Sequence, residues 1–163
     1  MNSDELLRSL LESHGDALWR VARAYAGSEG EEEDLHQEIL GQVWRALPSF
    51  RGESAAGTWM YRVALNTALT WKRRSSKHSA GRVSFERSEN GVRPSRPGSL
   101  RTEQAILEDF LETLRGPDRS VIVLYMEGLS YQEIADVTGL SVSHVGVRLH
   151  RMKQSFTERY VEE

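Results

Sequence analysis

A stretch of 26 residues near the middle of the chain has almost no apolar side chains. It reads SSKHSAGRVSFERSENGVRPSRPGSL, from Ser75 to Leu100, and it is rich in serine, glycine and arginine. A segment of this composition buries too little apolar surface to offset the entropy lost on ordering. We therefore expect a flexible linker over residues 76–100, which divides the 163 residues into two small domains, 1–75 and 101–163.

Hydrophobic periodicity predicts helices on both sides of this segment, with no β-hairpin signal and no internal repeat. In the first part, apolar stripes on either side of Gly15 predict two short helices, because glycine weakens a helix interior. A third helix is expected between GSEG and Pro48, and a fourth from about Thr58 to about Arg74. The third helix should bury Leu35, Ile39, Val43, Trp44 and Leu47, which recur at helical spacing.

The second part is predicted to form helices over residues 103–114, from Pro117, over residues 131–137 and from residue 142 onward. Gly139 suits a turn with positive φ, and the serines before the last two helices suit N-caps. The core stripe of the last helix should be Val142, Val145, Leu149, Met152 and Phe156. This layout is typical of a helix-turn-helix, whose second helix enters the DNA major groove; a plain helical hairpin is the alternative. The expected fold class is all-α, with two small helical domains joined by a flexible linker.

The formal net charge of −3 at pH 7 combines two blocks of opposite sign. Residues 29–38 contain six acids and no Lys or Arg, whereas residues 62–96 contain nine Lys or Arg and two acids. An acidic block favours a basic protein surface as partner, and a basic block favours a polyanion such as DNA. The chain is therefore expected to bridge two partners.

The predicted fourth helix combines basic and aromatic residues. One face carries Arg62, Asn66, Thr70 and Arg73, and the small-residue loop FRGESAAGTW precedes the helix. Aromatic rings beside cations suit unpaired bases, which stack on the rings while Lys and Arg hold the phosphates. The alternative is a set of core aromatics beneath a solvated basic face, and for Trp44 and Trp71 we expect a core position.

Two blocks of the sequence resemble one known family. EEEDLHQEILGQVWRALPSFRGESAAGTWMYRVALNTALTWKRR resembles the second conserved region of bacterial RNA polymerase sigma factors of the extracytoplasmic-function (ECF) type, in the sigma-70 family. LRGPDRSVIVLYMEGLSYQEIADVTGLSVSHVGVRLHRMKQSF resembles their fourth region, and the blocks follow one another in the family order. The resemblance implies a transcription initiation factor that binds core RNA polymerase, at its clamp helices and flap tip. It also implies recognition of the −10 and −35 promoter elements, nucleation of DNA melting, and control by an anti-sigma factor.

The resemblance further implies roles for individual residues. The polymerase-binding face would consist of Asp34, Gln37, Glu38, Gly41 and Arg45. The −10 contacts would come from Arg51, Gly52, Glu53, Ser54, Trp59, Arg62, Asn66, Thr70, Arg73 and Arg74, with residues 51–57 capturing a flipped base. The −35 contacts would come from Ser141, Ser143, His144, Gly146, Val147, Arg148, His150, Arg151, Lys153 and Gln154. The sequence departs from the family pattern at Gly146, where a basic residue is common, and at residues 55–57, where bulkier residues are common.

Two other function classes fit less of the sequence. An ordinary DNA-binding regulator with a dimerisation or sensing half leaves the DLHQEI motif and the basic-aromatic helix without a task. An enzyme is disfavoured because no HExxH, P-loop or GxSxG pattern occurs. The scattered histidines are expected at the surface or at caps: His14, His36, His78, His144 and His150. We expect no cofactor, no metal site and no membrane insertion, and the absence of cysteine and of a signal-like N-terminus predicts a cytoplasmic protein.

Overall fold

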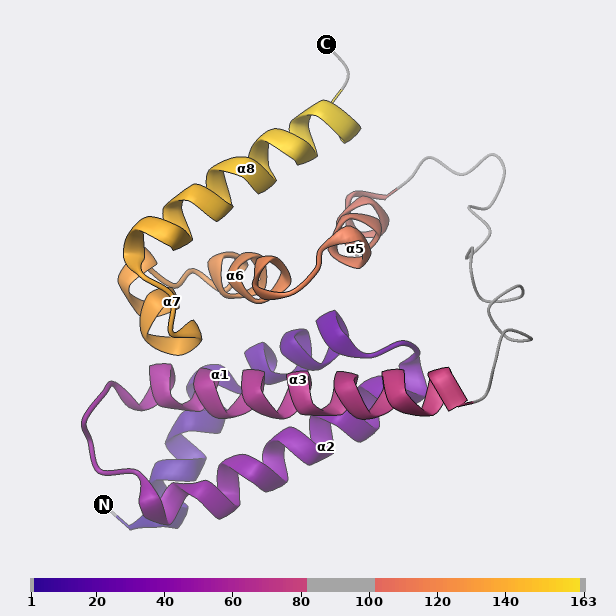
Figure 1. The fold of residues 1–163 in the computed structure, drawn as a ribbon. Helices are drawn as coiled ribbons and strands as arrows, with labels where there is room; N and C mark the ends of the chain where they lie inside the picture. Colours follow the sequence, from indigo (N-terminus) through magenta and orange to yellow (C-terminus); the bar gives the residue numbers. More distant parts are fainter. Residues whose placement is uncertain (1, 82–101, 162–163) are drawn as a thin grey trace.

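A computed structural model describes residues 2–81 and 102–161 of the chain. Within these ranges every regular element is helical and no β-strand occurs, which confirms the all-α prediction. Figure 1 shows two groups of helices, α1–α3 and α5–α8, which we call the N-terminal unit and the C-terminal unit. Most of the predicted linker, residues 82–100, lies outside the described residues.

The N-terminal unit begins with one long helix rather than two short ones. Helix α1 spans Ser3–Tyr25 and starts at a capping box formed by Asn2 and Glu5. It continues through Gly15, so the predicted break is wrong. A glycine in a helix interior costs only about 1 kcal/mol relative to alanine. Burial of Leu10 before it and Leu18 after it, in the same core, outweighs that cost.

Two further helices complete a three-helix bundle in which each helix packs on the other two. Helix α2 spans Glu29–Ala46 behind the N-cap Ser28, and the 3₁₀ turn η1, Leu47–Ser49, follows it. Helix α3 spans Ala56–Gly81, so it starts within the predicted capture loop and continues beyond Arg74 into the predicted linker. The side chains that fill the bundle include Leu18, Leu35, Ile39 and Met60, each fully buried.

The C-terminal unit contains the predicted helices with nearly the predicted bounds. They are α5 (Glu103–Thr113), α6 (Pro117–Met126), α7 (Tyr131–Thr138) and α8 (Val142–Tyr160). Helices α6, α7 and α8 pack on one another around Leu124, Ile134 and Leu149, which are fully buried. Phe110 of α5 meets Phe156 of α8 edge-on, with ring centroids 5.2 Å apart.

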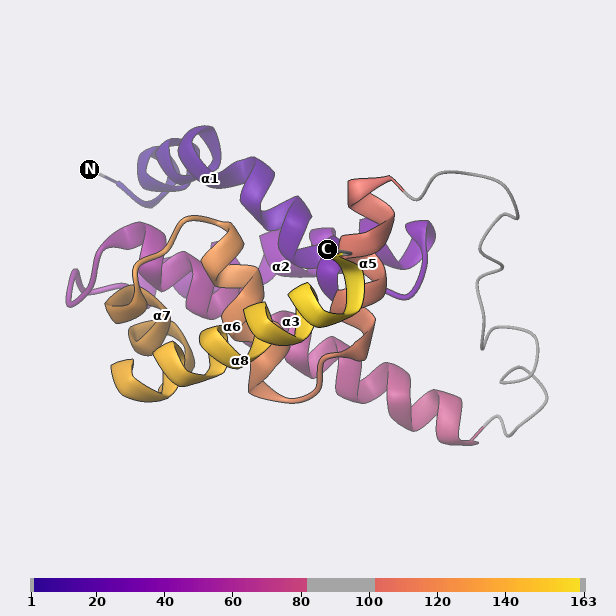
Figure 2. The same ribbon diagram turned by 90° about the horizontal axis from the view of Figure 1, so that it is seen from above.

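The two units lie against each other. Helix α7 packs on α3, and Figures 1 and 2 both place α6 and α7 over α1 and α3, with α2 on the far side of the bundle. Among the described residues, none of the helices has the length and hydropathy needed to cross a lipid bilayer.

Candidate nucleic-acid interface

The residues predicted to bind polymerase share one accessible face of α2. Asp34, Gln37 and Arg45 are exposed, and Glu38 and Gly41 are half-buried between them. The helical period puts these positions within one sector, away from the buried stripe. Arg45 lies across Gly41, because a Cβ built at Gly41 would lie 3.4 Å from the Arg45 Nη2 atom. The face presents two carboxylates, an amide and one guanidinium to a partner.

Trp44 belongs to this surface, so the core position that its helical spacing predicts is wrong. Its side chain is 59% exposed, whereas Leu35, Ile39, Val43 and Leu47 are buried as expected. Trp44 follows Gly41 by three residues, so it flanks the same face. The sequence feature that indicates the exposure of Trp44 is its position one residue after Val43, at the edge of the buried stripe.

The predicted capture loop combines exposed polar residues with one aromatic pair. Arg51, Gly52 and Glu53 are exposed, and Gly52 has φ +74°, which glycine adopts without strain. Trp59 is half-buried, and its ring lies 5.1 Å from that of Phe50 at 44°. Since Ala56 and Gly57 already belong to α3, only residues 51–55 form a loop.

The basic face of α3 is mostly open to solvent. Asn66, Thr70, Arg73 and Arg74 are exposed. Arg62 is half-buried, because its Nη2 donates to the backbone carbonyl of Asp136 in α7 at 2.7 Å. The buried side of the helix contains Met60, Tyr61, Ala64 and Ala68, whereas Trp71, for which a core position is expected, is only half-buried.

A groove between α2 and α3 joins the two predicted sites of the N-terminal unit. It has a volume of about 310 Å³, and Glu38 of the polymerase face lines it together with Asn66, Thr70 and Arg74. The predicted polymerase and −10 residues therefore meet along one seam of the bundle, so a partner bound to α2 would lie next to DNA on α3.

The helix-turn-helix geometry matches its sequence signals. The predicted N-cap Ser130 forms a capping box with Glu133 at the start of α7, and Gly139 ends α7 with φ +79°. Ser141 caps α8 by accepting a hydrogen bond from the backbone N–H of His144 at 3.1 Å. These contacts fix the turn that directs α8 away from α7.

Most of the predicted −35 residues lie on the exposed side of α8. The exposed ones are Ser141, Ser143, His144, Val147, His150, Arg151, Lys153 and Gln154, and the half-buried ones are Gly146 and Arg148. Val145, Leu149 and Met152 are buried as predicted, but Val142 is 41% exposed, so its assignment to the core is wrong. Val142 is the first residue of α8, in a first turn whose residues 142–144 are all exposed.

Two cations of α8 are tied to α6. Arg148 Nη1 lies 2.7 Å from a carboxylate oxygen of Asp118, in the first turn of α6. Lys153 Nζ lies 2.8 Å from the hydroxyl oxygen of Tyr125 and over its ring. These contacts position both side chains and leave fewer free cations on the exposed side of α8 than the sequence suggests.

One histidine departs from the surface assignment. His36 is buried, and its ring stacks on the Trp19 indole with centroids 3.5 Å apart at 9°. Burial lowers the pKa of His36, while the charge of Glu32 acts in the opposite direction. His36 therefore has a packing role between α1 and α2. Within residues 2–81 and 102–161, no cluster of His, Asp or Glu is arranged to hold a metal ion.

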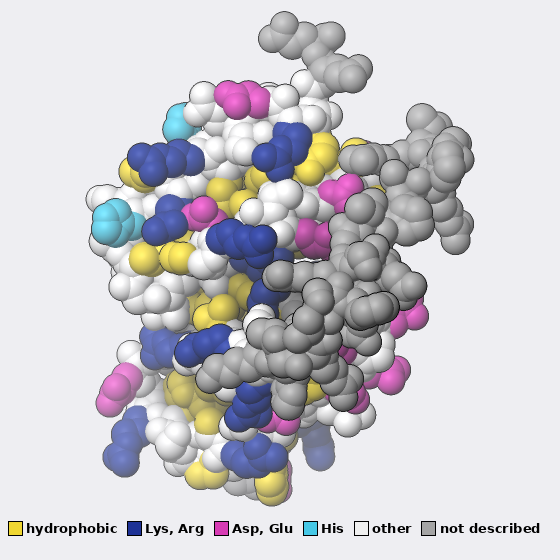
Figure 3. All heavy atoms as spheres, turned by 45° about the vertical axis from the view of Figure 1, so that its right-hand side comes forward, with side chains coloured by type: hydrophobic (Ala, Val, Ile, Leu, Met, Phe, Trp, Pro, Cys, Tyr) yellow, Lys and Arg dark blue, Asp and Glu magenta, His cyan; other side chains and the backbone are white. Residues whose placement is uncertain are grey.

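The cationic surface extends over both units. Figure 3 shows Lys and Arg side chains spread from one unit to the other on one face of the molecule. The acidic residues of α2 lie in a separate block of the sequence. The overall negative charge thus coexists with a basic face suited to phosphates.

Comparison with known proteins assigns a family region to each unit. Residues 10–78 match the model of sigma-70 region 2, and residues 104–156 match that of sigma-70 region 4. The chain is 32% identical over 138 residues to RNA polymerase sigma factor YlaC of Bacillus subtilis, covering 80% of each chain. It is also 32% identical over 141 residues to the ECF RNA polymerase sigma-E factor of Escherichia coli, covering 80% of this chain and 74% of that protein.

Two solved structures have a similar fold. CnrH, in complex with the cytosolic domain of CnrY, has a TM-score of 0.67 and 27% identity, covering 93% of this chain and 85% of that one. The sigma factor RpoE of Bartonella quintana, in complex with the anti-sigma factor NepR, has a TM-score of 0.71 and 22% identity, covering 93% and 94%. The region 2 match accounts for the first half of the chain, which the alternative of an ordinary helix-turn-helix regulator leaves unexplained. The chain therefore belongs to the ECF type of the sigma-70 family: it is an RNA polymerase sigma factor, which acts in transcription initiation and is not an enzyme.

Proposed function

We propose that the two units divide the promoter contacts between them, with polymerase holding both. Residues 1–75 bind core RNA polymerase, recognise the −10 element and nucleate its melting, residues 101–163 read the −35 element, and residues 76–100 link the two. The single observation that carries this assignment is the separation of charge by element. The acidic face lies on α2, while the basic DNA-facing residues lie on α3 and α8.

The α2 face supports the polymerase assignment. Asp34 and Gln37 are exposed beside Trp44, so a partner meets two kinds of contact on one surface. Aromatic anchors surrounded by polar residues are typical of protein interfaces. We assign this face to the clamp helices of polymerase and the C-terminal unit to its flap tip.

The energetics of DNA opening support a nucleating role rather than full melting. Separating a duplex forfeits stacking of about 1.4 kcal/mol per base-pair step, so a bubble of about ten pairs exceeds what one loop recovers. Extruding a single base costs only a few kcal/mol, which one pocket with stacking can offset. We therefore assign capture of the first base to residues 51–57 and maintenance of the bubble to polymerase.

Regulation by an anti-sigma factor is part of the proposal. CnrH, which is 27% identical to this chain, was solved with the cytosolic domain of CnrY. By analogy we propose that a protein partner sequesters this chain in the cytoplasm and releases it on a signal.

Charge reversal on α2 tests the polymerase assignment. Asp34→Lys with Glu38→Lys should abolish capture of purified core polymerase by the tagged chain and abolish promoter-specific transcription in vitro. Helix content and the thermal midpoint should stay close to wild type, because Asp34 is exposed and Glu38 only half-buried. Glu12→Lys with Glu158→Lys makes the same change in net charge at exposed positions on α1 and α8 and should retain capture. Equal capture by both double variants would show that α2 is not the docking element.

A further inference from the structure

The contact between the two units depends on specific polar bonds as well as apolar packing. Tyr25 of α1 and Ser120 of α6 share a buried hydrogen bond of 2.8 Å between their hydroxyl oxygens. The guanidinium of Arg119, a residue that is only 7% exposed, donates to the Ala24 carbonyl at 3.3 Å and to the Leu111 carbonyl at 2.7 Å. Directional bonds of this kind define one relative placement of the units.

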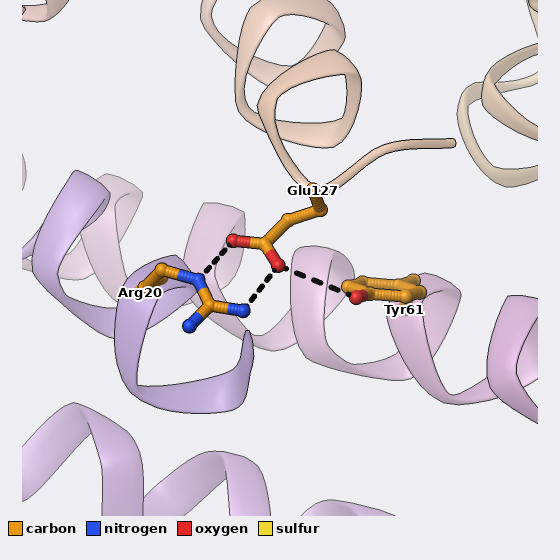
Figure 4. Close-up of polar contacts among 3 residues, drawn as sticks. All are labelled: Arg20, Tyr61 and Glu127. Atoms are coloured by element: carbon orange, nitrogen blue, oxygen red, sulfur yellow. Dashed lines mark hydrogen bonds and ion pairs between the residues drawn. The ribbon is translucent and has the colours of Figure 1, made fainter. Parts of the chain in front are cut away.

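The central polar contact joins Arg20 of α1 to Glu127 at the end of α6. Arg20 Nε and Nη2 lie 2.5 and 2.7 Å from the two carboxylate oxygens, a bidentate arrangement that Figure 4 shows. The hydroxyl of Tyr61 in α3 donates to the same carboxylate at 3.5 Å. Burial, followed by the charge of Glu127, raises the pKa of Tyr61 to about 12, so its proton stays in place at neutral pH. We call this trio the latch.

The two charged side chains of the latch differ in their exposure to solvent, which allows the latch to open and close. The Glu127 side chain is 6% exposed, whereas that of Arg20 is 56% exposed. Glu127 also occupies the C-cap of α6, the negative end of the helix, where a carboxylate is unfavourable. Its desolvation in the closed arrangement is therefore offset chiefly by Arg20, and separation of the units returns both groups to water.

The closed arrangement uses residues that the proposed function needs for DNA. Arg62, a proposed −10 contact, donates instead to the carbonyl of Asp136 near the C-terminal end of α7. Asn66, the next proposed contact along α3, lines a cavity of about 380 Å³ together with Val137 and Thr138 of α7. The Arg62 side chain cannot cap α7 and hold the promoter strand at the same time.

The spacing of promoter elements also excludes simultaneous reading by the closed chain. The −10 and −35 elements lie about 25 base pairs apart, or roughly 85 Å at about 3.4 Å per pair. In this structure α7 of the −35 reader packs directly on α3 of the −10 reader. The units must separate before both elements are bound.

We propose that this chain restrains itself: the Arg20–Glu127–Tyr61 latch holds the helix-turn-helix unit over the −10 face, and promoter binding requires the latch to open. This inference rests on the proposed function for its consequence in transcription, but not for the closed arrangement itself. Helix α2, which carries the proposed polymerase-binding residues, lies on the side of the bundle away from the C-terminal unit (Figure 1), so polymerase can dock on the closed chain. The closed arrangement then lowers the apparent promoter affinity in proportion to the fraction of molecules that are open.

Arg20→Gln is the variant that tests the latch. It removes the exposed partner and leaves Glu127 buried without its counterion in the closed arrangement only, so the closed-to-open ratio should fall about tenfold. Arg20 is more than half exposed in α1, so the N-terminal unit keeps its core. Arg23→Gln is the matched control. Arg23 is 55% exposed on the same helix and pairs with Glu32 within the N-terminal unit, at 3.2 Å.

The distance between the units is the primary measurement. The chain has no cysteine, so Ser13→Cys and Glu158→Cys introduce the only two spin labels, one on α1 and one on α8. Pulsed electron resonance should give one short distance in wild type and in Arg23→Gln, and a longer, broader distribution in Arg20→Gln. The double variant Arg20→Gln with Glu127→Gln should return toward the wild-type distance, because no charge is left buried.

Transcription gives a second measurement that a damaged fold would not reproduce. With purified core polymerase, Arg20→Gln should reach half-maximal transcription at a concentration about three- to tenfold below that of wild type. A gain of activity distinguishes an opened latch from loss of stability. Identical distance distributions in Arg20→Gln and wild type would overturn the latch. A wider separation without a gain in transcription would overturn the restraint, and a wild-type chain that starts no transcripts would overturn the proposed function alone.

Discussion

Trp44 is the residue whose environment differs most from expectation. An indole that is 59% exposed contributes little to folding but offers a large apolar contact to a partner. We predict that Trp44→Ala changes the free energy of unfolding by less than about 0.5 kcal/mol. The same variant should weaken binding to core polymerase by about five- to thirtyfold.

Urea unfolding and surface-immobilised polymerase measure the two effects of Trp44→Ala. Trp71→Ala is the comparison, since Trp71 is half-buried in α3 and its loss should reduce stability clearly more. If Trp44→Ala lowers stability as much as Trp71→Ala does and leaves polymerase binding intact, Trp44 is a packing residue.

His36 makes the stability of the N-terminal unit depend on pH. Because burial lowers its pKa below the usual 6.5, the folded state favours the neutral ring. The stabilisation that the neutral His36 ring provides is fully present above pH 6.5, the usual pKa of the unfolded state. It is lost as the pH falls from 6.5 toward the lower pKa that His36 has in the folded state. We predict that His36→Phe, which can keep the stack on Trp19, loses less unfolding free energy than wild type between pH 7 and pH 5.

Denaturant titrations at both pH values measure this difference. His144→Gln replaces an exposed histidine and should retain the wild-type loss on acidification. Parallel pH profiles for wild type and His36→Phe would mean that the buried imidazole does not titrate on folding.

At the scale of elements, two glycines have opposite roles. A Cβ at Gly15, in the interior of α1, would meet no atom within 4 Å, so Gly15→Ala should stabilise the chain by about 0.5–1 kcal/mol. Gly139 has φ +79° between α7 and α8, where alanine is strained, so Gly139→Ala should destabilise it by about 1 kcal/mol or more. Thermal and urea unfolding of both variants check the two signs, and a loss of stability in Gly15→Ala would indicate that α1 needs a bend there.

The bounds of most elements follow from local signals in the sequence. The Ser130–Glu133 capping box, Gly139 and Ser141 fix α7 and α8 through contacts within a few residues, so the sequence alone predicts them. The continuity of α1 depends instead on burial of Leu10 and Leu18 against other helices, which no local propensity contains. The helical period of the apolar residues predicts the buried faces of α2 and α8. Trp44 and Val142 lie at the margins of those faces, where packing against other helices decides whether a side chain is exposed.

At the scale of the whole molecule, the placement of the two units could not be predicted from the sequence. Arg20 and Glu127 are separated by 107 residues, and Arg62 and Asp136 by 74, with no periodicity or motif linking them. The side chains of Arg20, Glu127 and Arg62 each look like ordinary solvated charges, and the partner of Arg62 is the backbone carbonyl of Asp136. The proposed promoter contacts rest on family resemblance, and no pattern in the sequence indicates that the closed chain occupies some of them.

The affinity of the free chain for promoter DNA depends on both units and on the contact between them. With a net charge of −3, Arg62 bound to α7 and Arg148 paired with Asp118, few cations are available for phosphates. We predict that fluorescence anisotropy detects no promoter complex tighter than about 10⁻⁶ M for the isolated chain at physiological salt. Adding core polymerase should produce a stable complex on the same fragment. A promoter complex of nanomolar affinity without polymerase would contradict both the closed arrangement and the proposal that polymerase holds the two units on the promoter. Each of these two claims by itself requires the free chain to bind DNA weakly.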